Sequence, residues 1–185
     1  MNGDLGKPAR ALGLLAAMGL AGACASAPET RQERRTLEQQ AAMTLRGMIE
    51  RDPTLEEVLD EAAGYVVFPE IGKGGAVVGG AQGVGVVYED GMPIGYAALN
   101  QATFGAQLGG QTFSELIVFR EQAALERLKA GNFDLTADAS ATAVASGAAA
   151  RTTFEEGTAV FIAGQQGLMA EATVGDQQIS FEPMA

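Results

Sequence analysis

The stretch that decides the fold is rich in glycine and valine. It reads GYVVFPEIGKGGAVVGGAQGVGVVY and occupies residues 64–88. Before Gly64 the apolar residues recur at helical spacing, and after it they form the runs and alternations typical of strands. In residues 83–86 glycine alternates with valine, so one face of the expected strand carries no side chains. Such a face allows a sheet to bend tightly, or another element to pack closely on it.

More strands are expected after this stretch. The Asp90-Gly91 pair is a hairpin signal and predicts a turn into a strand at residues 94–99. A short helix is expected at residues 121–129, ending at Gly131. The other expected strands are residues 106–111, 115–119, 141–145, 158–163, 168–174 and 178–181.

Two helices are expected before this stretch. Residues 32–51 carry apolar side chains at three- and four-residue spacing, and Pro53 ends that pattern. Thr54 and Glu57 have the spacing of a capping box for a second helix. Helices followed by many short strands predict an α+β fold, with N-terminal helices packed on a largely antiparallel, strongly curved, glycine-rich sheet or barrel.

The first residues have the order of a signal peptide. Lys7 and Arg10 precede a ten-residue apolar run that is too short to span a bilayer, and small residues lead to Cys24. This ending resembles the lipobox of bacterial lipoproteins, in which the cysteine is lipidated and becomes the first mature residue. Ordinary cleavage near Ala23, without lipidation, is the alternative.

The lipobox resemblance predicts a division of the chain and a location. Residues 1–23 are expected to be the signal peptide, residues 24–31 a lipidated tether and residues 32–185 the folded domain. Ala25 after Cys24 resembles the pattern that sorts lipoproteins to the outer membrane. We therefore expect a secreted protein, lipid-anchored on the periplasmic side of the outer membrane.

Composition excludes several kinds of chemistry. The chain of 185 residues has no histidine and a single cysteine, so it has no imidazole base, no usual zinc ligand set and no internal disulfide. A net charge of −11 disfavours nucleic-acid binding. Carboxylate-only catalysis through Asp134 and Asp138 stays open, but both are more simply turn and surface residues. We expect no catalytic residue, no metal site and no cofactor.

The glycine cluster has other interpretations. A phosphate-binding loop would need Ser or Thr after a Gly-Lys pair, whereas Lys73 is followed by Gly74. Gly75, Gly79 and Gly83 have the spacing of packed membrane helices, but the apolar run around them is too short. The structural interpretation, a tightly bent sheet, is favoured.

Three glycine-rich blocks, in this order, resemble the SYLF family. They are residues 63–85 (with Lys73-Gly74-Gly75 and Gly83-Val84-Gly85), residues 105–111 (GAQLGGQ) and residues 166–170 (QGLMA). The resemblance covers roughly residues 37–181. It implies a lipid-binding domain, because eukaryotic members are associated with phosphoinositide-containing membranes. Some fungal members are associated with actin, a partner that we do not expect for a secreted bacterial domain.

Candidate contacts to anionic lipid headgroups follow from the positions of the cations. Five of the twelve Lys and Arg residues lie within residues 31–51, and Arg35 and Arg46 share the helix face opposite the apolar stripe. Lys73, expected in a glycine-rich loop, is the third candidate. The favoured alternative is that these arginines pair with Glu29, Glu33, Glu38 and Glu50, so that the helix merely packs on the sheet.

Three functions remain open from the sequence. The first is a membrane-surface module that binds lipid through the acyl anchor and anionic headgroups. The second is a structural lipoprotein of the envelope that binds another envelope protein. The third, an enzyme, has little support from the sequence.

Overall fold

The computed structural model describes residues 26–75, 78–104, 111–131, 133–135, 141–164 and 177–184. Within these residues, two helices come first, and the strands of one mixed sheet follow with a third helix and a short 3-10 helix between them. The elements are α1 (Arg31–Arg51), α2 (Thr54–Asp60), β1 (Gly64–Gly75), β2 (Val78–Glu89), β3 (Met92–Phe104), β4 (Gln111–Phe119), α3 (Gln122–Lys129), β5 (Asp134–Leu135), β6 (Ala141–Ala143), the short 3-10 helix η1 (Ala149–Arg151), β7 (Thr158–Gly164) and β8 (Gln177–Pro183).

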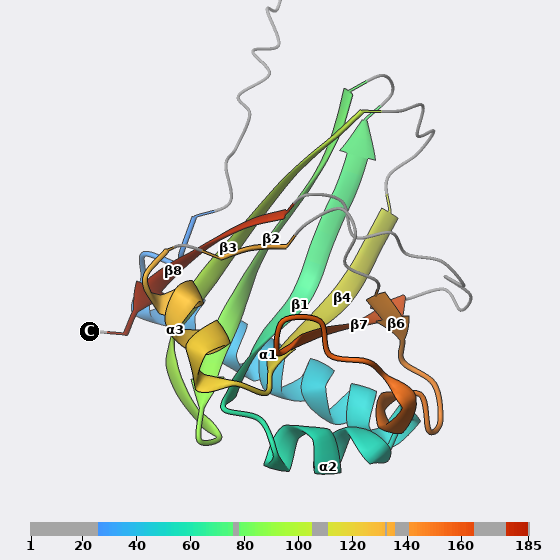
Figure 1. Cartoon of the computed structure of the whole chain (residues 1–185). Coiled ribbons are helices and arrows are strands. Elements are labelled where there is room, and N and C mark those ends of the chain that lie inside the picture. The colour runs from blue at the N-terminus through green and yellow to red at the C-terminus, as the bar shows by residue number, and fades with distance from the viewer. Residues whose placement is uncertain are drawn as a thin grey trace, which may run out of the picture.

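The described strands form one strongly curled, eight-stranded sheet with the order β5-β8-β3-β2-β1-β4-β7-β6. All neighbours are antiparallel except β6 and β7, which are parallel. Helices α1 and α2 lie on one side of the sheet and α3 lies on the other (Figure 1). The α+β prediction, with N-terminal helices on a largely antiparallel curved sheet, is confirmed.

Both faces of the central strands are buried. In β4, Leu116 and Val118 belong to the core under α1 and α2, whereas Ile117 and Phe119 belong to the core under α3. Strands β1 and β7 alternate in the same way. A strand that is covered on both faces has apolar residues throughout, which explains why residues 65–68 and 116–119 are continuous apolar runs.

The glycines of β2 allow β1 to approach closely. A Cβ atom on Gly85 would lie 2.7 Å from the carbonyl oxygen of Val67 and 2.8 Å from the ring of Phe68. On Gly83 it would lie 2.8 Å from Cγ1 of Ile71. A register shift in β1 places both Phe68 and Ile71 in the core under α3. The bare strand face predicted from the sequence is therefore filled by side chains from β1.

Most of the expected elements are found, with small changes of boundary. Asp90 and Gly91 have φ values of 51° and 72° and form the turn between β2 and β3. The expected strand from residue 74 to residue 88 is divided between the end of β1 and β2, and both parts are strands rather than a membrane helix. The expected strand at residues 168–174 and most of the one at residues 106–111 lie outside the described residues.

The predicted capping box of α2 is wrong. Thr54 is the first residue of the helix, and no side chain caps it from the N-cap position, Pro53. Asp52 takes that role, because its carboxylate accepts hydrogen bonds from the amide and hydroxyl of Thr54 at 3.2 and 2.6 Å. The same carboxylate accepts from the amides of Gly147 and Ala149 at 2.9 and 2.8 Å. It therefore joins the helix pair to the segment that contains η1.

The pKa of Asp52 follows from these contacts. Burial alone would raise it, but the hydrogen bonds from the Thr54 hydroxyl and the amides of Ala149, Gly147 and Thr54 lower it by more. A lowered pKa means that the folded state favours the carboxylate. The stabilisation is therefore present above the usual pKa of aspartate and is lost as the pH falls through the lowered value.

We predict that Gly85→Ala lowers the free energy of unfolding by about 2 kcal/mol, because the added methyl group overpacks the contact with Val67 and Phe68. The matched control is Gly72→Ala in β1, where an added Cβ atom meets nothing within 4 Å. Urea denaturation of both variants at neutral pH measures the difference. Equal stabilities would contradict the role given to the bare face of β2.

We predict that Asp52→Ala lowers the free energy of unfolding by about 3 kcal/mol, because it leaves buried amide donors without their charged acceptor. Asp60→Ala, at an exposed position in α2, should change the unfolding free energy by no more than about 0.5 kcal/mol. The measurement is urea denaturation at pH 7. A loss at Asp52 no larger than that at Asp60 would show that the carboxylate does not hold η1 to the helices.

Candidate functional site

Helix α1 begins at Arg31, the last residue of the predicted tether. Thr30 is its N-cap, and its hydroxyl accepts from the amide of Glu33 at 3.2 Å while the Glu33 carboxylate accepts from the amide of Thr30 at 2.9 Å. The hydrogen bond from the Thr30 amide is the main reason why the pKa of Glu33 is lowered. This capping box fixes the first helical residue at Arg31, one residue earlier than expected.

The inner face of α1 is held on the sheet by apolar and polar contacts. Ala41 and Met48 are buried against it. Near the start of the helix, the Tyr96 hydroxyl donates to the Glu38 carboxylate at 2.8 Å, and the Arg34 guanidinium lies 5.7 Å from the centre of the Tyr96 ring. Burial and then the contact with Glu38 raise the pKa of Tyr96 to about 12, so it stays protonated.

The outer face of α1 carries exposed basic side chains. Arg35 and Arg46 are exposed, and in the described part of the chain no carboxylate oxygen lies within 4.0 Å of either. The pairing of the α1 arginines with nearby glutamates is therefore wrong for these residues, since Glu33 caps the helix and Glu38 binds Tyr96. The favoured alternative is therefore confirmed for the apolar stripe, which packs on the sheet, but Arg35 and Arg46 form no ion pair with any described residue.

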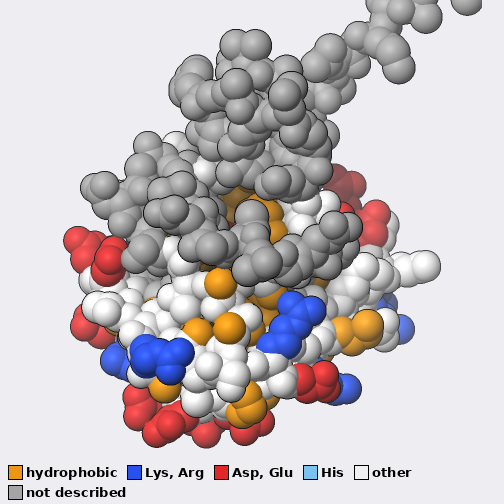
Figure 2. All heavy atoms as spheres, turned by 90° about the vertical axis from the view of Figure 1, so that its right-hand side faces the viewer, with side chains coloured by type: hydrophobic (Ala, Val, Ile, Leu, Met, Phe, Trp, Pro, Cys, Tyr) orange, Lys and Arg blue, Asp and Glu red, His pale blue; other side chains and the backbone are white. Residues whose placement is uncertain are grey.

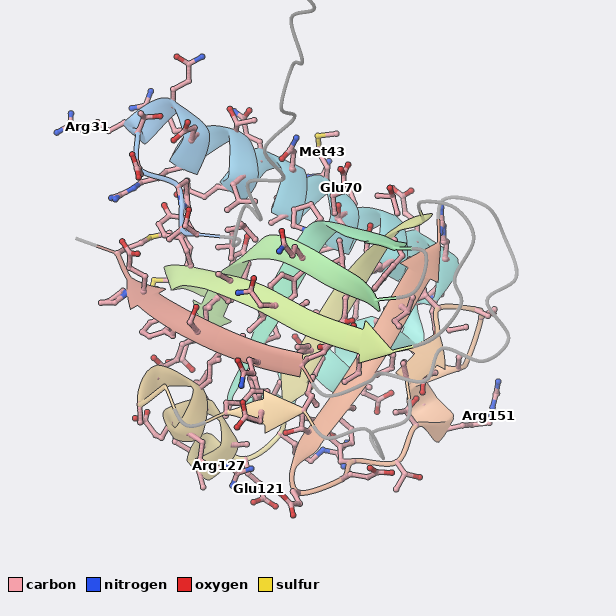
Figure 3. All side chains as sticks on the ribbon, turned by 90° about the horizontal axis from the view of Figure 1, so that it is seen from above. Arg31, Met43, Glu70, Glu121, Arg127 and Arg151 are labelled. Atoms are coloured by element: carbon pink, nitrogen blue, oxygen red, sulfur yellow. The ribbon has the colours of Figure 1, made fainter. Side chains whose placement is uncertain are left out.

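An exposed methionine accompanies these arginines. Met43 is 69% exposed and points away from the sheet on the outer side of α1, while Arg31 extends from the N-terminal end of the helix (Figure 3). Figure 2 shows another face, the side of the molecule that carries β4, β7 and β6, where basic side chains stand beside hydrophobic ones and acidic side chains gather at the lower edge and the flanks. The outer surface of α1 thus combines positive charge with an apolar side chain.

The other predicted site residues are not brought to this surface. Cys24 lies outside the described residues. The backbone of Lys73 pairs with Ala81 and Gln111 within β1, so Lys73 lies in a strand and not in a glycine loop. Arg35 and Arg46 share one helix face, whereas Lys73 lies near the end of β1. The three cations do not come from one element.

Sequence reasoning missed a second feature, a glutamate inside the curled sheet. Glu115 in β4 is fully buried, and one of its carboxylate oxygens accepts from the side-chain amide of Gln177 in β8 at 3.3 Å. Its other oxygen, Oε1, and the Gln177 oxygen have no hydrogen-bond partner among the described residues. Gln101, the register partner of Gln177 in β3, is also buried.

The contact between Glu115 and Gln177 depends on the curl of the sheet. Strands β4 and β8 are separated by three strands in the sheet order, yet their side chains meet across the interior. The sequence held a signal for this position, since Glu115 is the one charged residue among residues 113–119, where Ser114 is the only other polar residue. Period-two alternation places it on the face of Ile117 and Phe119, which is the core under α3.

Burial raises the pKa of Glu115 to about 7, and the hydrogen bond from Gln177 offsets this only in part. Between pH 4.5 and 7 the folded state keeps a proton that the unfolded state releases. The stability of the fold therefore decreases as the pH rises through this window. A buried carboxyl group without a cationic partner costs stability at neutral pH.

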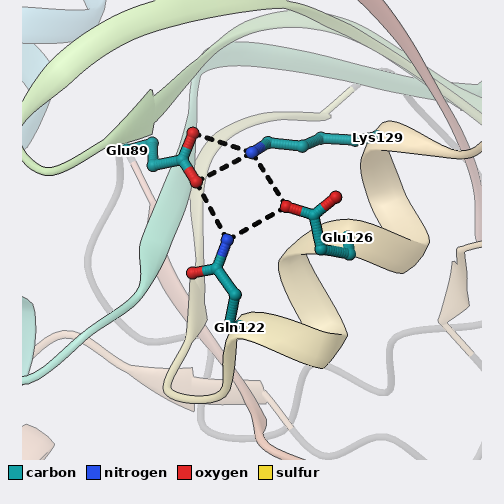
Figure 4. A network of polar contacts seen from close by, with 4 residues as sticks. All are labelled: Glu89, Gln122, Glu126 and Lys129. Carbon is teal, nitrogen blue, oxygen red and sulfur yellow. Dashed lines mark hydrogen bonds and ion pairs between the residues drawn. The ribbon is translucent and has the colours of Figure 1, made fainter.

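A third polar cluster is structural. Lys129 donates to both Glu89 carboxylate oxygens at 2.8 and 2.7 Å and to Glu126 at 3.0 Å (Figure 4). Gln122 donates to the same two carboxylates at 3.0 Å. These contacts hold α3 to the end of β2, beside the β2–β3 turn. Their partners satisfy one another, which leaves no group directed at a ligand.

The described residues contain no helix that is long and apolar enough to cross a membrane. They also contain no group of three or more acidic, His or Cys side chains that is suited to a metal ion. The arrangement therefore offers a basic helix surface and a buried carboxyl group as its two unusual features.

Helices on both faces of a curled sheet define an α+β domain. A protein-family model, Ysc84, described as Las17-binding protein actin regulator, matches residues 100–182. This match confirms the resemblance to the SYLF family. The matched segment runs from the later part of β3 to β8 and includes both Glu115 and Gln177. No curated protein matches the chain.

We predict that Glu115→Gln raises the free energy of unfolding at pH 8 by up to about 3 kcal/mol and leaves it almost unchanged at pH 4, because it removes the cost of burying a charge. The control is Glu182→Gln, at an exposed position in β8. Urea denaturation between pH 4 and 8 measures both variants. If the free energy of unfolding changes with pH equally in the wild-type protein and in Glu115→Gln, the proton on Glu115 does not control stability.

Proposed function

We propose that this protein is a lipoprotein of the bacterial envelope that works as a membrane-surface module and carries out no catalysis. The observation that supports this proposal best is the exposed surface of α1, which carries Met43 together with Arg35 and Arg46, two exposed arginines that form no ion pair with any described residue. The chain as a whole is acidic, so a local basic surface is what an anionic headgroup would meet.

The position of the proposed anchor favours this use of α1. If Cys24 carries the acyl chains, six residues separate it from Arg31, so seven Cα–Cα steps lead to the start of the helix. A fully extended chain of that length spans about 25 Å, so α1 stays close to the bilayer. A short tether raises the effective concentration of lipid headgroups near α1, so contacts that are weak one by one can add up.

The structure limits how α1 can contact a bilayer. A free amphipathic helix would bury its apolar stripe among the acyl chains. In this domain that stripe, with Ala41 and Met48, is already packed on the sheet. The contact that we propose is therefore made by the opposite face, through the guanidinium groups and Met43.

The partner that we propose is anionic phospholipid at the periplasmic side of the outer membrane. The words Las17-binding and actin regulator describe the matched family. A lipoprotein on the periplasmic side of the outer membrane would meet no actin, and we propose anionic phospholipid in its place. The alternative is an envelope protein bound by the same face, and chemical crosslinking in cells would recover it.

We predict that the exported chain carrying Cys24→Ser, which removes the acyl anchor, still binds vesicles that contain anionic phospholipid. Arg35→Glu with Arg46→Glu should weaken this binding by at least about thirtyfold, since the loss of each cation near an anionic surface costs about 1 kcal/mol and the added carboxylates are repelled as well. Flotation of vesicles with and without anionic lipid measures the binding.

The control is the pair Arg127→Glu and Arg151→Glu, which changes the charge equally at two exposed positions outside α1 (Figure 3). Equal losses in the two double variants would show that only total charge matters. Absence of vesicle binding at either lipid composition would refute the membrane proposal and favour a protein partner.

A further inference from the structure

Gly47 is a glycine in the interior of α1 that neither packing nor backbone conformation requires. A Cβ atom at this position would meet nothing within 4 Å, and the φ of Gly47 is not positive. Glycine is among the least favourable residues inside a helix. What the glycine provides at this position is the open space beside the helix.

That space is a groove between α1 and the β4–β7 side of the sheet. Met43, Gly47 and Arg51 follow one another at four-residue spacing and form one wall. Ser114 of β4 and the end of β7 form the other wall. The hollow measures about 280 Å³ and is lined by Met43, Thr44, Gly47, Met48, Arg51, Ser114, Ala163 and Gly164.

The lining combines two methionines and small residues with the hydroxyl groups of Thr44 and Ser114 and one cation. Met43 and Met48 contribute flexible thioether side chains, which adapt to chains of irregular shape. Ser114 already donates its hydroxyl to the carbonyl of Pro69 at 2.7 Å. Arg51 is exposed, and no described carboxylate oxygen lies within 4.0 Å of it. The groove therefore offers one positive charge beside the two methionines and the space left open at Gly47.

We propose that this groove holds part of one acyl chain of an anionic membrane phospholipid, with its phosphate at Arg51. Charge complementarity selects an anionic headgroup, and the channel left open by Gly47 selects an unbranched chain. The volume lies just below the range of about 300–1,000 Å³ typical of pockets that bury a whole ligand, so it suits a chain segment. This inference rests on the membrane-surface function proposed above and adds a specific lipid site to it.

The test uses the exported chain carrying Cys24→Ser and ¹³C-methyl methionine, titrated with monomeric dihexanoyl phosphatidylglycerol. The methyl signals of Met43 and Met48 should shift, and that of Met92 should not, although Met92 is 64% exposed. Gly47→Leu fills the channel and should weaken binding by about tenfold or more. Ala42→Leu, on the same helix but outside the groove, should leave it unchanged.

Two further arms separate the outcomes. Inorganic phosphate alone should not shift the Met48 signal, and Arg51→Glu should weaken binding of the short-chain lipid. If vesicles bind but the Met43 and Met48 signals do not respond to the lipid, or if Gly47→Leu binds like wild type, the groove is not a lipid site and the membrane proposal stands. If vesicles do not bind while the short-chain lipid shifts both signals, the groove stands and the membrane-surface proposal fails.

Discussion

The close approach of β1 and β2 is the constraint on which the rest of the structure depends. Gly83 and Gly85 lack the atoms that would collide with the backbone and side chains of β1, so Phe68 and Ile71 cover them on the side of α3. The curled sheet then brings β8 opposite β4, although three strands separate them in the sheet. The interior, the outer position of α1 and the groove beside it all follow from this curvature.

Two buried carboxyl groups show how the surroundings decide the chemistry of one kind of group. Asp52 is surrounded by amide and hydroxyl donors, so its charge is stabilised and its pKa is lowered. Glu115 has one side-chain amide and apolar neighbours, so its pKa is raised. The first carboxylate strengthens the link between distant segments. The second weakens the fold at neutral pH, because its charged form is buried among apolar neighbours.

Helix α1 has two faces with separate tasks. Because its apolar stripe packs on the sheet, the membrane contact that we propose uses the outer arginines, Met43 and the groove at Gly47. This distinguishes the domain from peripheral helices that insert their apolar face. The helix is presented as a rigid surface, held in orientation by the Thr30 capping box and by the contact between Tyr96 and Glu38.

The sequence by itself determined the order of the helices and strands, the turn at Asp90-Gly91 and the need for a tightly bent glycine-rich sheet, because these depend on local periodicity and on glycine geometry. It also placed Arg35 and Arg46 on one helix face, since that follows from helical spacing alone. Only the tertiary structure decided that Arg35 and Arg46 form no ion pair with a described residue. It also decided that Asp52 accepts hydrogen bonds from Gly147 and Ala149, and that Glu115 meets Gln177. Those contacts join segments about 60 to 100 residues apart, and local patterns carry no information about such distances.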